Sequence, residues 1–301
     1  MAERHVSSDQ TDLADPGVLD FNPPSAVEFW RWTAPLRAYF RPRFFGLENI
    51  RADKPTLLVG NHTIYGILDA PQMIAKIYKE NGVLVRALAD HAHFDVPVWR
   101  DVLKKSGGVD GTRPNCRALM ASGAHILVFP GGGREVAKRK GEEYQLTWKN
   151  RTGFARMAIE NGYSITPFAS LGPDDALDIV WDANDIMDSP LGYALRRSGL
   201  YEGPLRDGDM IMPIARGVGL SMLPRPERFY FGFGKPISTR KYQGMQDDPE
   251  ALMDLRGRTK RAIKRELKKL EEIRKTEDTN SIFSRIVSFK RRKLRDDTGS
   301  A

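Results

Sequence analysis

Short apolar runs alternate with stretches of helical periodicity from Thr56 to Leu171, and this alternation restricts the possible folds more than any other feature of the sequence. Such spacing favours parallel strands, because each helix carries the chain back to the end of the sheet where the next strand begins. The sequence therefore predicts an α/β fold, a largely parallel mixed sheet flanked by helices. The expected strands are residues 56–60, 82–90, 108–109, 124–130, 164–172, 210–216 and 228–234. The expected helices are residues 69–80, 96–105, 114–122, 148–160 and 249–275.

Charge is unevenly distributed along the chain. The net charge is +8, yet residues 256–295 contain 16 Lys and Arg against 5 Asp and Glu, so the remainder is slightly acidic. With 301 residues, of which 41% are hydrophobic, the chain can bury a sizeable core. We expect a mobile N-terminal arm (1–25), an amphipathic segment (26–50), the α/β domain (51–245), and a basic amphipathic helix with a tail (246–301).

Two segments combine apolar side chains with many cations. Residues 26–45 hold seven aromatic residues and four arginines, and residues 281–295 hold five large apolar residues before a basic run. One interpretation is that both segments adhere to a membrane surface, where amphipathic side chains are apolar at one end and wet at the other. The alternative for residues 26–45 is a helix packed on the domain with its arginines directed to solvent. Nucleic acid is a weaker interpretation of the basic tail, because no nucleic-acid-binding motif accompanies the charge.

The sequence disfavours several other classes of protein. A single cysteine forms no intramolecular disulfide, and the first thirty residues lack the pattern of a secretion signal, so we expect a reducing, cytosolic setting. No window approaches the ~18–20 apolar residues that a spanning helix needs, and the mean hydropathy is −0.46. His91 and His93 lack further ligands at a suitable spacing, so we expect no metal site. Cys116 has no neighbouring base in a predicted helix, which indicates a small core residue.

Polar residues follow the first predicted strand at the place where parallel sheets collect their ligands, beyond the carboxyl ends of the strands. Asn61 and His62 come directly after residues 56–60, and a glycine-containing turn and Asp69 follow them. A neutral imidazole takes up a proton near pH 7, and a carboxylate can hold its tautomer and stabilise the imidazolium. His62 is therefore the candidate general base, Asp69 or Glu135 the candidate carboxylate, and Asn61 a candidate substrate-binding residue. The alternative is a hydrogen-bonded structural histidine.

A glycine-rich turn, Gly131, Gly132 and Gly133, follows the strand of residues 124–130. Backbone N–H groups in such a turn can bind an anion or a developing oxyanion. The turn lacks the Lys-Ser/Thr of a P-loop and the GxGxxG spacing of a dinucleotide site, so neither nucleotide site is expected. Arg134, and Arg113 near another predicted turn, are candidates for pairing with a phosphate or carboxylate of the substrate. The alternative is two ordinary surface arginines.

Four segments of the sequence carry a resemblance to a known family: LLVGNHTIYGILDAP, GTRPNCRALM, ILVFPGGGRE and ITPFAS. In this order and separation they resemble the four motifs of the glycerolipid acyltransferase superfamily, the lysophospholipid acyltransferase-like proteins. The similarity spans residues 55–171. The FPGG-x-RE form is more similar to the branch with monoacylglycerol and diacylglycerol acyltransferases and related ester synthases than to the glycerol-phosphate branch.

The resemblance implies an O-acyltransferase in which His62 deprotonates a hydroxyl group that then attacks an acyl thioester. It also implies that an aspartate supports the histidine, that Arg113 contacts a phosphate or polar head of the acceptor, and that Pro167 is the proline of the fourth motif. Two departures stand out. Six residues separate His62 from Asp69 where the family has four, and Gly131 stands where the phosphate branch has glutamate. The second departure argues against a lysophosphatidic acid-type acceptor.

The substrates and the setting follow from the same resemblance. The implied co-substrate is acyl-CoA or acyl carrier protein, and the acceptor is a lipid hydroxyl such as that of a mono- or diacylglycerol or a lysophospholipid. No bound cofactor is expected. We expect a peripheral protein at the cytoplasmic face of a membrane, in contact with an anionic membrane surface. Two alternatives are a non-catalytic lipid-binding protein of the same fold, and an acyl thioester hydrolase that uses water as acceptor.

Overall fold

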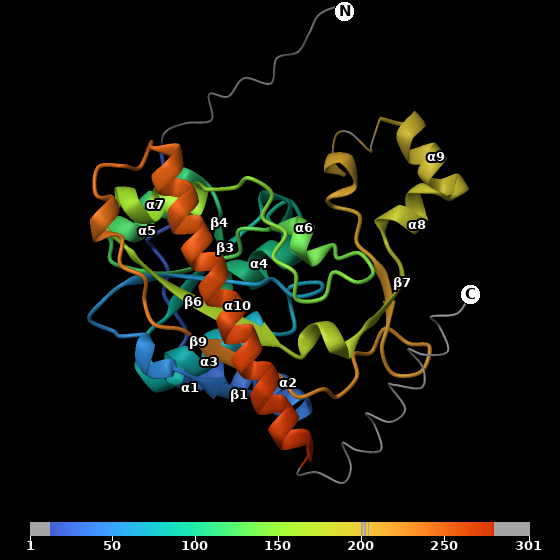
Figure 1. Cartoon of the computed structure of the whole chain (residues 1–301), viewed down its shortest axis with the longest axis horizontal. Coiled ribbons are helices and arrows are strands. Elements are labelled where there is room, and N and C mark those ends of the chain that lie inside the picture. Colours follow the sequence, from blue (N-terminus) through green and yellow to red (C-terminus); the bar gives the residue numbers. More distant parts are fainter. Residues whose placement is uncertain (1–12, 200, 202, 204, 280–301) are drawn as a thin grey trace, which may run out of the picture.

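The computed structural model describes residues 13–199, 201, 203 and 205–279 (Figure 1). Its main sheet has seven strands in the order β1-β9-β6-β2-β5-β3-β4, and every neighbouring pair is parallel except β6 and β9. The predicted α/β fold with a largely parallel mixed sheet is thereby confirmed. The strands of this sheet are β1 (Arg43–Phe45), β2 (Thr56–Gly60), β3 (Val85–Ala89), β4 (Val109–Asp110), β5 (His125–Val128), β6 (Ser164–Leu171) and β9 (Tyr230–Phe233).

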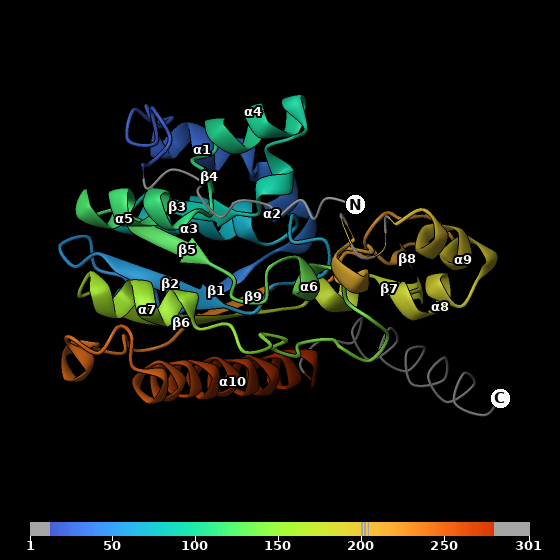
Figure 2. The ribbon, with the colours of Figure 1, turned by 90° about the horizontal axis from the view of Figure 1, so that it is seen from above.

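Helices cover both faces of the sheet, with α1 and α3 above it and α7 and α10 below it in Figure 2. One apolar core joins α1, α2 and α3 to the sheet, and a second core joins α5, α7 and α10 to the opposite face. Because both faces are covered, every residue of β2 is buried. The helices named so far are α1 (Ala26–Trp32), α2 (Ala34–Phe40), α3 (Ala70–Asn81), α5 (Arg113–Ala121), α7 (Gly153–Glu160) and α10 (Pro249–Thr279). The other helices are α4 (Pro97–Lys105), α6 (Gly133–Val136), α8 (Ala183–Met187) and α9 (Pro190–Arg197).

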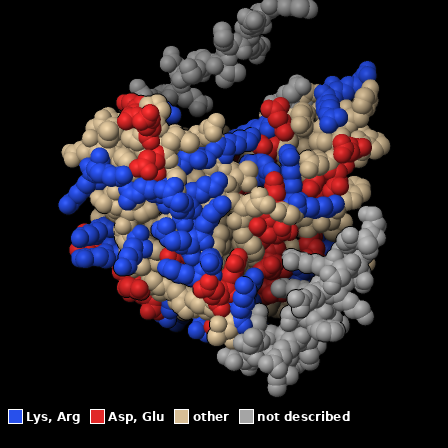
Figure 3. Space-filling model, viewed as in Figure 1, with Lys and Arg blue, Asp and Glu red and all other residues tan. Residues whose placement is uncertain are grey.

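The last described helix, α10, is amphipathic, as its sequence pattern predicts. It packs on β6, β9 and α7 through the buried side chains of Leu255, Ile263 and Leu270. Its opposite face is basic, and Figure 3 shows lysines and arginines gathered over this helix. The exposed cations there are Arg261, Lys264, Arg265, Lys268, Lys269 and Lys275. The basic charge of this helix is therefore a solvated face opposite an apolar one.

The aromatic residues of the segment 26–50 are mostly packed on the domain. Phe40 stacks on Phe229 with ring centroids 4.0 Å apart, and Phe44 stacks on Phe231 at 4.9 Å. β1 joins the main sheet beside β9, so the segment is continuous with the α/β domain. Trp32 is the exception, with 59% of its surface exposed. The predicted membrane-adhering tail, residues 281–295, lies outside the described residues.

An excursion between β6 and β9, residues 172–229, extends beyond the main sheet (Figure 2). It contains a second sheet of two antiparallel strands, β7 (Asp178–Trp181) and β8 (Ile214–Arg216), together with α8 and α9. The sequence analysis predicts the strand at 210–216 but not its partner or these helices. No helix among the described residues is long and apolar enough to cross a membrane.

Candidate active site

His62 lies at the edge of the sheet where β2, β5 and β6 end. β2 ends at Gly60 beside Phe168 of β6, and a Cβ atom at Gly60 would lie 2.4 Å from that phenyl ring. Glycine therefore allows the strand to end tightly against its neighbour. Two residues later the imidazole of His62 stacks on Phe129, which follows β5, with ring centroids 3.8 Å apart and planes 7° from parallel. Residues from two adjacent strand ends thus fix the orientation of the ring.

The surroundings of His62 keep its imidazole neutral. Burial, followed by the positive charge of Lys138 and by His93, lowers the pKa of His62 from 6.5 to about 3. Its Nδ1 atom is buried and has no hydrogen-bond partner among the described residues. An unpaired buried polar atom costs ~1–3 kcal/mol, and such atoms are uncommon in folded proteins outside strained or catalytic positions. The imidazole is therefore neutral, and stacking sets its orientation.

Gly66 confines the same ring from the following turn. Its φ is +67°, and a Cβ atom there would lie 2.4 Å from Cε1 and 2.9 Å from Nε2 of His62. Glycine is needed both for the left-handed backbone and for the space beside the imidazole.

We expect Gly66→Ala to displace the His62 ring and to lower turnover by at least about tenfold, since ~1 Å misplacements at active sites cost as much as 10²-fold. The turnover and the melting temperature of the variant measure this effect. Gly82→Ala is the matched control, because Gly82 also has a positive φ (+66°) but would meet nothing within 4 Å. Equal loss of turnover in both variants would mean that backbone strain alone is responsible.

Glu135 anchors the loop that carries His62. Its Oε2 accepts a hydrogen bond from the backbone N–H of His62 at 3.1 Å, and its Oε1 accepts one from Thr147 at 2.8 Å. The carboxylate lies against Gly131, where a Cβ atom would come within 2.2 Å of Glu135 Cδ. Burial raises the pKa of Glu135 to about 7, although these N–H donors and Lys138 lower it. Glu135 therefore holds the backbone of His62, and within the described residues it makes no hydrogen bond to the ring.

Asp69 caps the helix that follows the loop of His62. Its Oδ1 accepts a hydrogen bond from Ala70 at 2.9 Å at the start of α3. Burial raises the pKa of Asp69, and the neighbouring hydroxyls of Ser170 and Thr63 oppose that shift. No hydrogen bond between Asp69 and the His62 ring occurs in the described part of the chain. Which carboxylate supports the imidazole during a reaction therefore stays a prediction.

The glycine-rich turn presents backbone donors beside His62. The carbonyl of Gly131 accepts a hydrogen bond from Arg151 at 2.6 Å, and Gly132 adopts a φ of +51° and donates to Phe129. Within the described residues, the N–H groups of Gly131 and Gly133 have no acceptor. These two N–H groups can therefore donate to an anion or an oxyanion.

The other candidate residues from the sequence lie in different surroundings. Asn61 is buried and exchanges two hydrogen bonds of 2.9 Å with the backbone of Ser170, so its amide joins β2 to β6. Arg134 is buried and forms a bidentate pair with Glu142, so a substrate phosphate there would have to displace a carboxylate. Arg113 is exposed after β4, three strands from β2, on the same edge of the sheet. Their contacts with substrate stay predictions.

A buried ion pair behind the site was missed in the sequence analysis. Lys138 Nζ lies 3.5 Å from Asp174 Oδ2, and both side chains are almost completely buried. Asp174 accepts hydrogen bonds from the backbone of Ile64 at 2.8 Å and of Tyr144 at 3.0 Å. Asp174 follows the apolar run of β6, so the rule that selected His62 could have found it. Lys138 carries no such signal.

Cys116 is a core residue, as predicted. It is 4% exposed, and burial raises the pKa of its thiol to about 11. A thiol in this state is a poor nucleophile at neutral pH.

Comparison with known proteins gives a consistent family. The model of the family Acyltransferase matches residues 41–171. The chloroplast phytyl ester synthase 2 of Arabidopsis thaliana is 32% identical over 252 residues, which cover 80% of this chain and 36% of that protein. The human "DGAT1/2-independent enzyme synthesizing storage lipids" is 34% identical over 122 residues, which cover 40% of this chain and 37% of that protein. The chain therefore spans little more than a third of the length of these relatives.

A solved structure has the same fold. The 1-acyl-sn-glycerophosphate (LPA) acyltransferase PlsC from Thermotoga maritima superposes with a TM-score of 0.50 at 13% identity, and the match covers 82% of this chain and 79% of that chain. At this identity the similarity concerns the arrangement of strands and helices.

Proposed function

Since the chain belongs to the glycerolipid acyltransferase superfamily, we propose that it transfers a fatty acyl group from a thioester donor to a lipid hydroxyl, with His62 as general base. The observation that carries this proposal is the placement of the His62 imidazole after β2, stacked on Phe129 and confined by Gly66. A hydroxyl is a poor nucleophile at neutral pH, and a positioned base contributes ~10²–10⁴-fold to such a reaction.

The proposed reaction balances without any further reactant. The acceptor oxygen attacks the thioester carbonyl carbon while His62 takes the hydroxyl proton, so that a C–O bond forms and the carbonyl oxygen becomes an oxyanion. The N–H groups of Gly131 and Gly133 are the proposed donors to this oxyanion, a contribution of ~3–4 kcal/mol in related sites. The C–S bond then breaks, and the imidazolium returns its proton to the thiolate.

The acceptor is proposed from the chemistry in the relatives' names. One relative is named for ester synthesis on phytyl groups and another for the synthesis of storage lipids. Long-chain alcohols and mono- or diacylglycerols are therefore the acceptors we favour, with acyl-CoA or acyl carrier protein as donor.

These acceptors reside in membranes, and we propose that the excursion 172–229 brings the catalytic edge to the bilayer surface. It leaves and re-enters the main sheet at the edge where β6 ends. Half of the exposed large apolar side chains among the described residues belong to it. Trp181 and Ile214 of this set are register partners in β7 and β8, and exposed apolar surface favours attachment to a membrane or another partner. These side chains are Val180, Trp181, Leu191, Tyr193, Met212, Ile214, Val218, Leu220, Met222 and Leu223.

The test is acyl transfer from radiolabelled long-chain acyl-CoA, and separately from acyl carrier protein, with vesicles that contain one acceptor at a time. Phytol, a saturated fatty alcohol, monoacylglycerol, diacylglycerol and a lysophospholipid are offered separately. A labelled ester that requires one of these acceptors supports the proposal and identifies the acceptor. Release of free fatty acid alone would instead identify a thioester hydrolase. No turnover of either donor would favour a non-catalytic lipid-binding protein.

The pKa of His62 predicts the acid side of the pH profile. The neutral form of the imidazole is the base, and it is lost only as the pH falls through the pKa of about 3, not through the ordinary value of 6.5. We therefore expect the titration of His62 to cause no loss of kcat/KM, which reports ionisations of the free enzyme, between pH 7 and about pH 5. The same profile of Glu135→Gln separates the titration of Glu135, which has its pKa at about 7. A half-loss near pH 6.5 that persists in this variant would contradict the prediction.

A further inference from the structure

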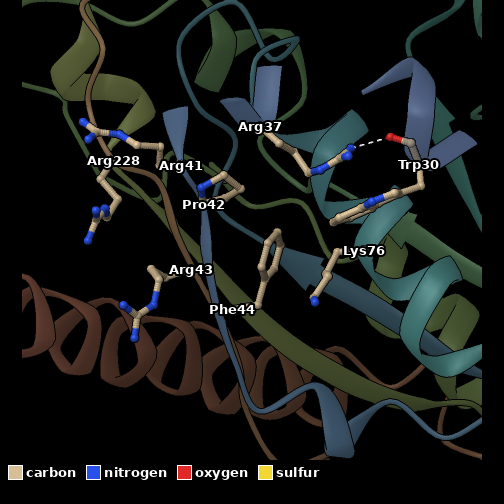
Figure 4. A pocket seen from close by; sticks show the side chains of 8 residues that line it. All are labelled: Trp30, Arg37, Arg41, Pro42, Arg43, Phe44, Lys76 and Arg228. Atoms are coloured by element: carbon tan, nitrogen blue, oxygen red, sulfur yellow. Dashed lines mark hydrogen bonds between the residues drawn. The ribbon is translucent and has the colours of Figure 1, made fainter. Parts of the chain in front are cut away.

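A basic hollow lies on the surface beside α2 and the start of β1, apart from the residues of the catalytic site. Its volume is ≈ 390 Å³, and Figure 4 shows the side chains that line it, which come from α1, α2, β1, α3 and the segment before β9. Five of the lining residues are cations: Arg37, Arg41, Arg43, Lys76 and Arg228.

The strand register places this hollow at the same edge of the sheet as His62. β1 and β9 run opposite to β2, so the residues before them lie at the edge where β2 ends. Through β9, Arg43 is level with Leu171 of β6, whereas Gly60 of β2 is level with Phe168. Three strand spacings separate β1 from β2, which corresponds to roughly 14 Å. A molecule at the catalytic edge can span this distance.

The cations of the hollow outnumber the carboxylates that face them. Arg43 and Arg228 share Glu277, at 3.0 Å and 2.9 Å, and Lys76 pairs with Glu80 at 2.9 Å. Within the described residues these two carboxylates pair with three of the five cations, and no carboxylate pairs with the other two. The hollow therefore has a positive charge that internal pairs do not neutralise.

Arg37 and Arg41 have no carboxylate partner in the described part of the chain. The guanidinium of Arg37 lies 3.3 Å from the centre of the Trp30 ring and donates to the Trp30 carbonyl. Burial lowers the pKa of Arg37, so its charge is partly desolvated without a compensating anion. Arg41 is exposed and ends α2 in the left-handed conformation. Both arginines have donors left for an incoming acceptor, since a guanidinium carries five N–H groups.

We propose that this hollow binds the phosphate of an organic phosphate compound, either the headgroup of an anionic phospholipid or the coenzyme A part of the donor. Forked guanidinium groups suit phosphate oxygens. Trp30 already has the Arg37 guanidinium over its ring and Phe44 stacks on Phe231, while five cations line the hollow, so its main binding chemistry is that of a phosphate site. The two candidate compounds follow from the proposed function, but the phosphate chemistry rests on the hollow alone.

The test is equilibrium binding of the full chain to two probes without any acyl transfer. One probe is coenzyme A in solution, and the other is phosphatidylcholine vesicles with and without phosphatidylglycerol. The variants are Arg41→Ala and Arg41→Glu. Neither arginine, alanine nor glutamate is favoured in the left-handed conformation, so these changes alter charge more than backbone energy. The matched controls are Arg261→Ala and Arg261→Glu, on the exposed face of α10.

We expect Arg41→Ala to weaken binding to one probe by about tenfold, and Arg41→Glu to weaken it more, because a charge-assisted contact is lost and then reversed. A loss confined to coenzyme A identifies the donor as the source of the phosphate, and a loss confined to the anionic vesicles identifies the lipid headgroup. Binding of both probes that falls no further than in the Arg261 variants would overturn the proposal. This binding test is independent of the acyl-transfer assay, so the two together distinguish an active enzyme whose hollow binds no phosphate from an inactive protein whose hollow binds it.

Discussion

His62→Ala is expected to reduce acyl transfer by at least about 10²–10⁴-fold, because it removes the base that takes the hydroxyl proton. The substitution should leave the fold intact. The ring makes a stacking contact with Phe129, and its buried Nδ1 has no partner whose hydrogen bond would be lost. Turnover of the thioester in the presence of the best acceptor, beside the melting temperature, measures both effects.

The control for this change is a second histidine near the same edge of the sheet. His91 is exposed, and its Nδ1 lies 2.6 Å from Asp110. A surface pair of this kind contributes little to stability, so His91→Ala should keep its turnover within about twofold. If a folded His62→Ala protein still transferred acyl groups at the original rate, the assignment of the base would be wrong. If His62→Ala lost acyl transfer but still hydrolysed the thioester, the reaction with water would not need His62, whereas the reaction with the lipid hydroxyl would.

The order of elements in the α/β domain could be predicted because each apolar run is bounded by clear signals. Three glycines follow the run of residues 124–130, which the structure confirms as β5. The helix of residues 69–80 has a proline in its first turn, and the structure confirms it as α3. β7, α8 and α9 could not be predicted in the same way. Two small apolar clusters stabilise them, and each joins residues that are distant in sequence. One consists of Ile64, Leu177 and Ala215, and the other joins the buried side chains of α8 to Ile211.

The candidate site shows the same division between local and long-range information. His62 could be selected because it follows a strand, and the position of a strand end depends on local sequence. The partners of Glu135 could not be predicted from the sequence. They are the backbone N–H groups of His62 and Thr147, and the paths of two loops determine where these groups lie. The predicted helix over 148–160 begins only at Gly153 for a related reason. Lys149 adopts a φ of +47°, and the Arg151 guanidinium binds the carbonyl of Gly131.

Lys138→Met is expected to destabilise the protein by about 3–5 kcal/mol at pH 7, since it leaves the carboxylate of Asp174 buried without a cation. The loss should shrink at acid pH. Burial raises the pKa of Asp174 and Lys138 lowers it, so removal of the lysine raises it further. A carboxyl group whose folded pKa lies above its unfolded value favours folding at low pH and loses that contribution as the pH rises. Urea unfolding of the original protein and of Lys138→Met, at about pH 5 and at about pH 7, measures the loss of unfolding free energy at each pH.

The comparison variants determine whether the ion pair itself is responsible. Lys140→Met removes an exposed lysine paired with Asp185 at 2.8 Å, and we expect a change within about 0.5 kcal/mol. Lys138→Met/Asp174→Asn should cost less than the sum of its single changes, because neither partner is then a lone buried charge. Recovery should be incomplete, since Asp174 accepts from both Ile64 and Tyr144 and an amide has only one acceptor oxygen. Strictly additive costs would show that the two charges are independent. The backbone of Ile64, two residues from His62, would then owe its position to the hydrogen bonds of Asp174 alone.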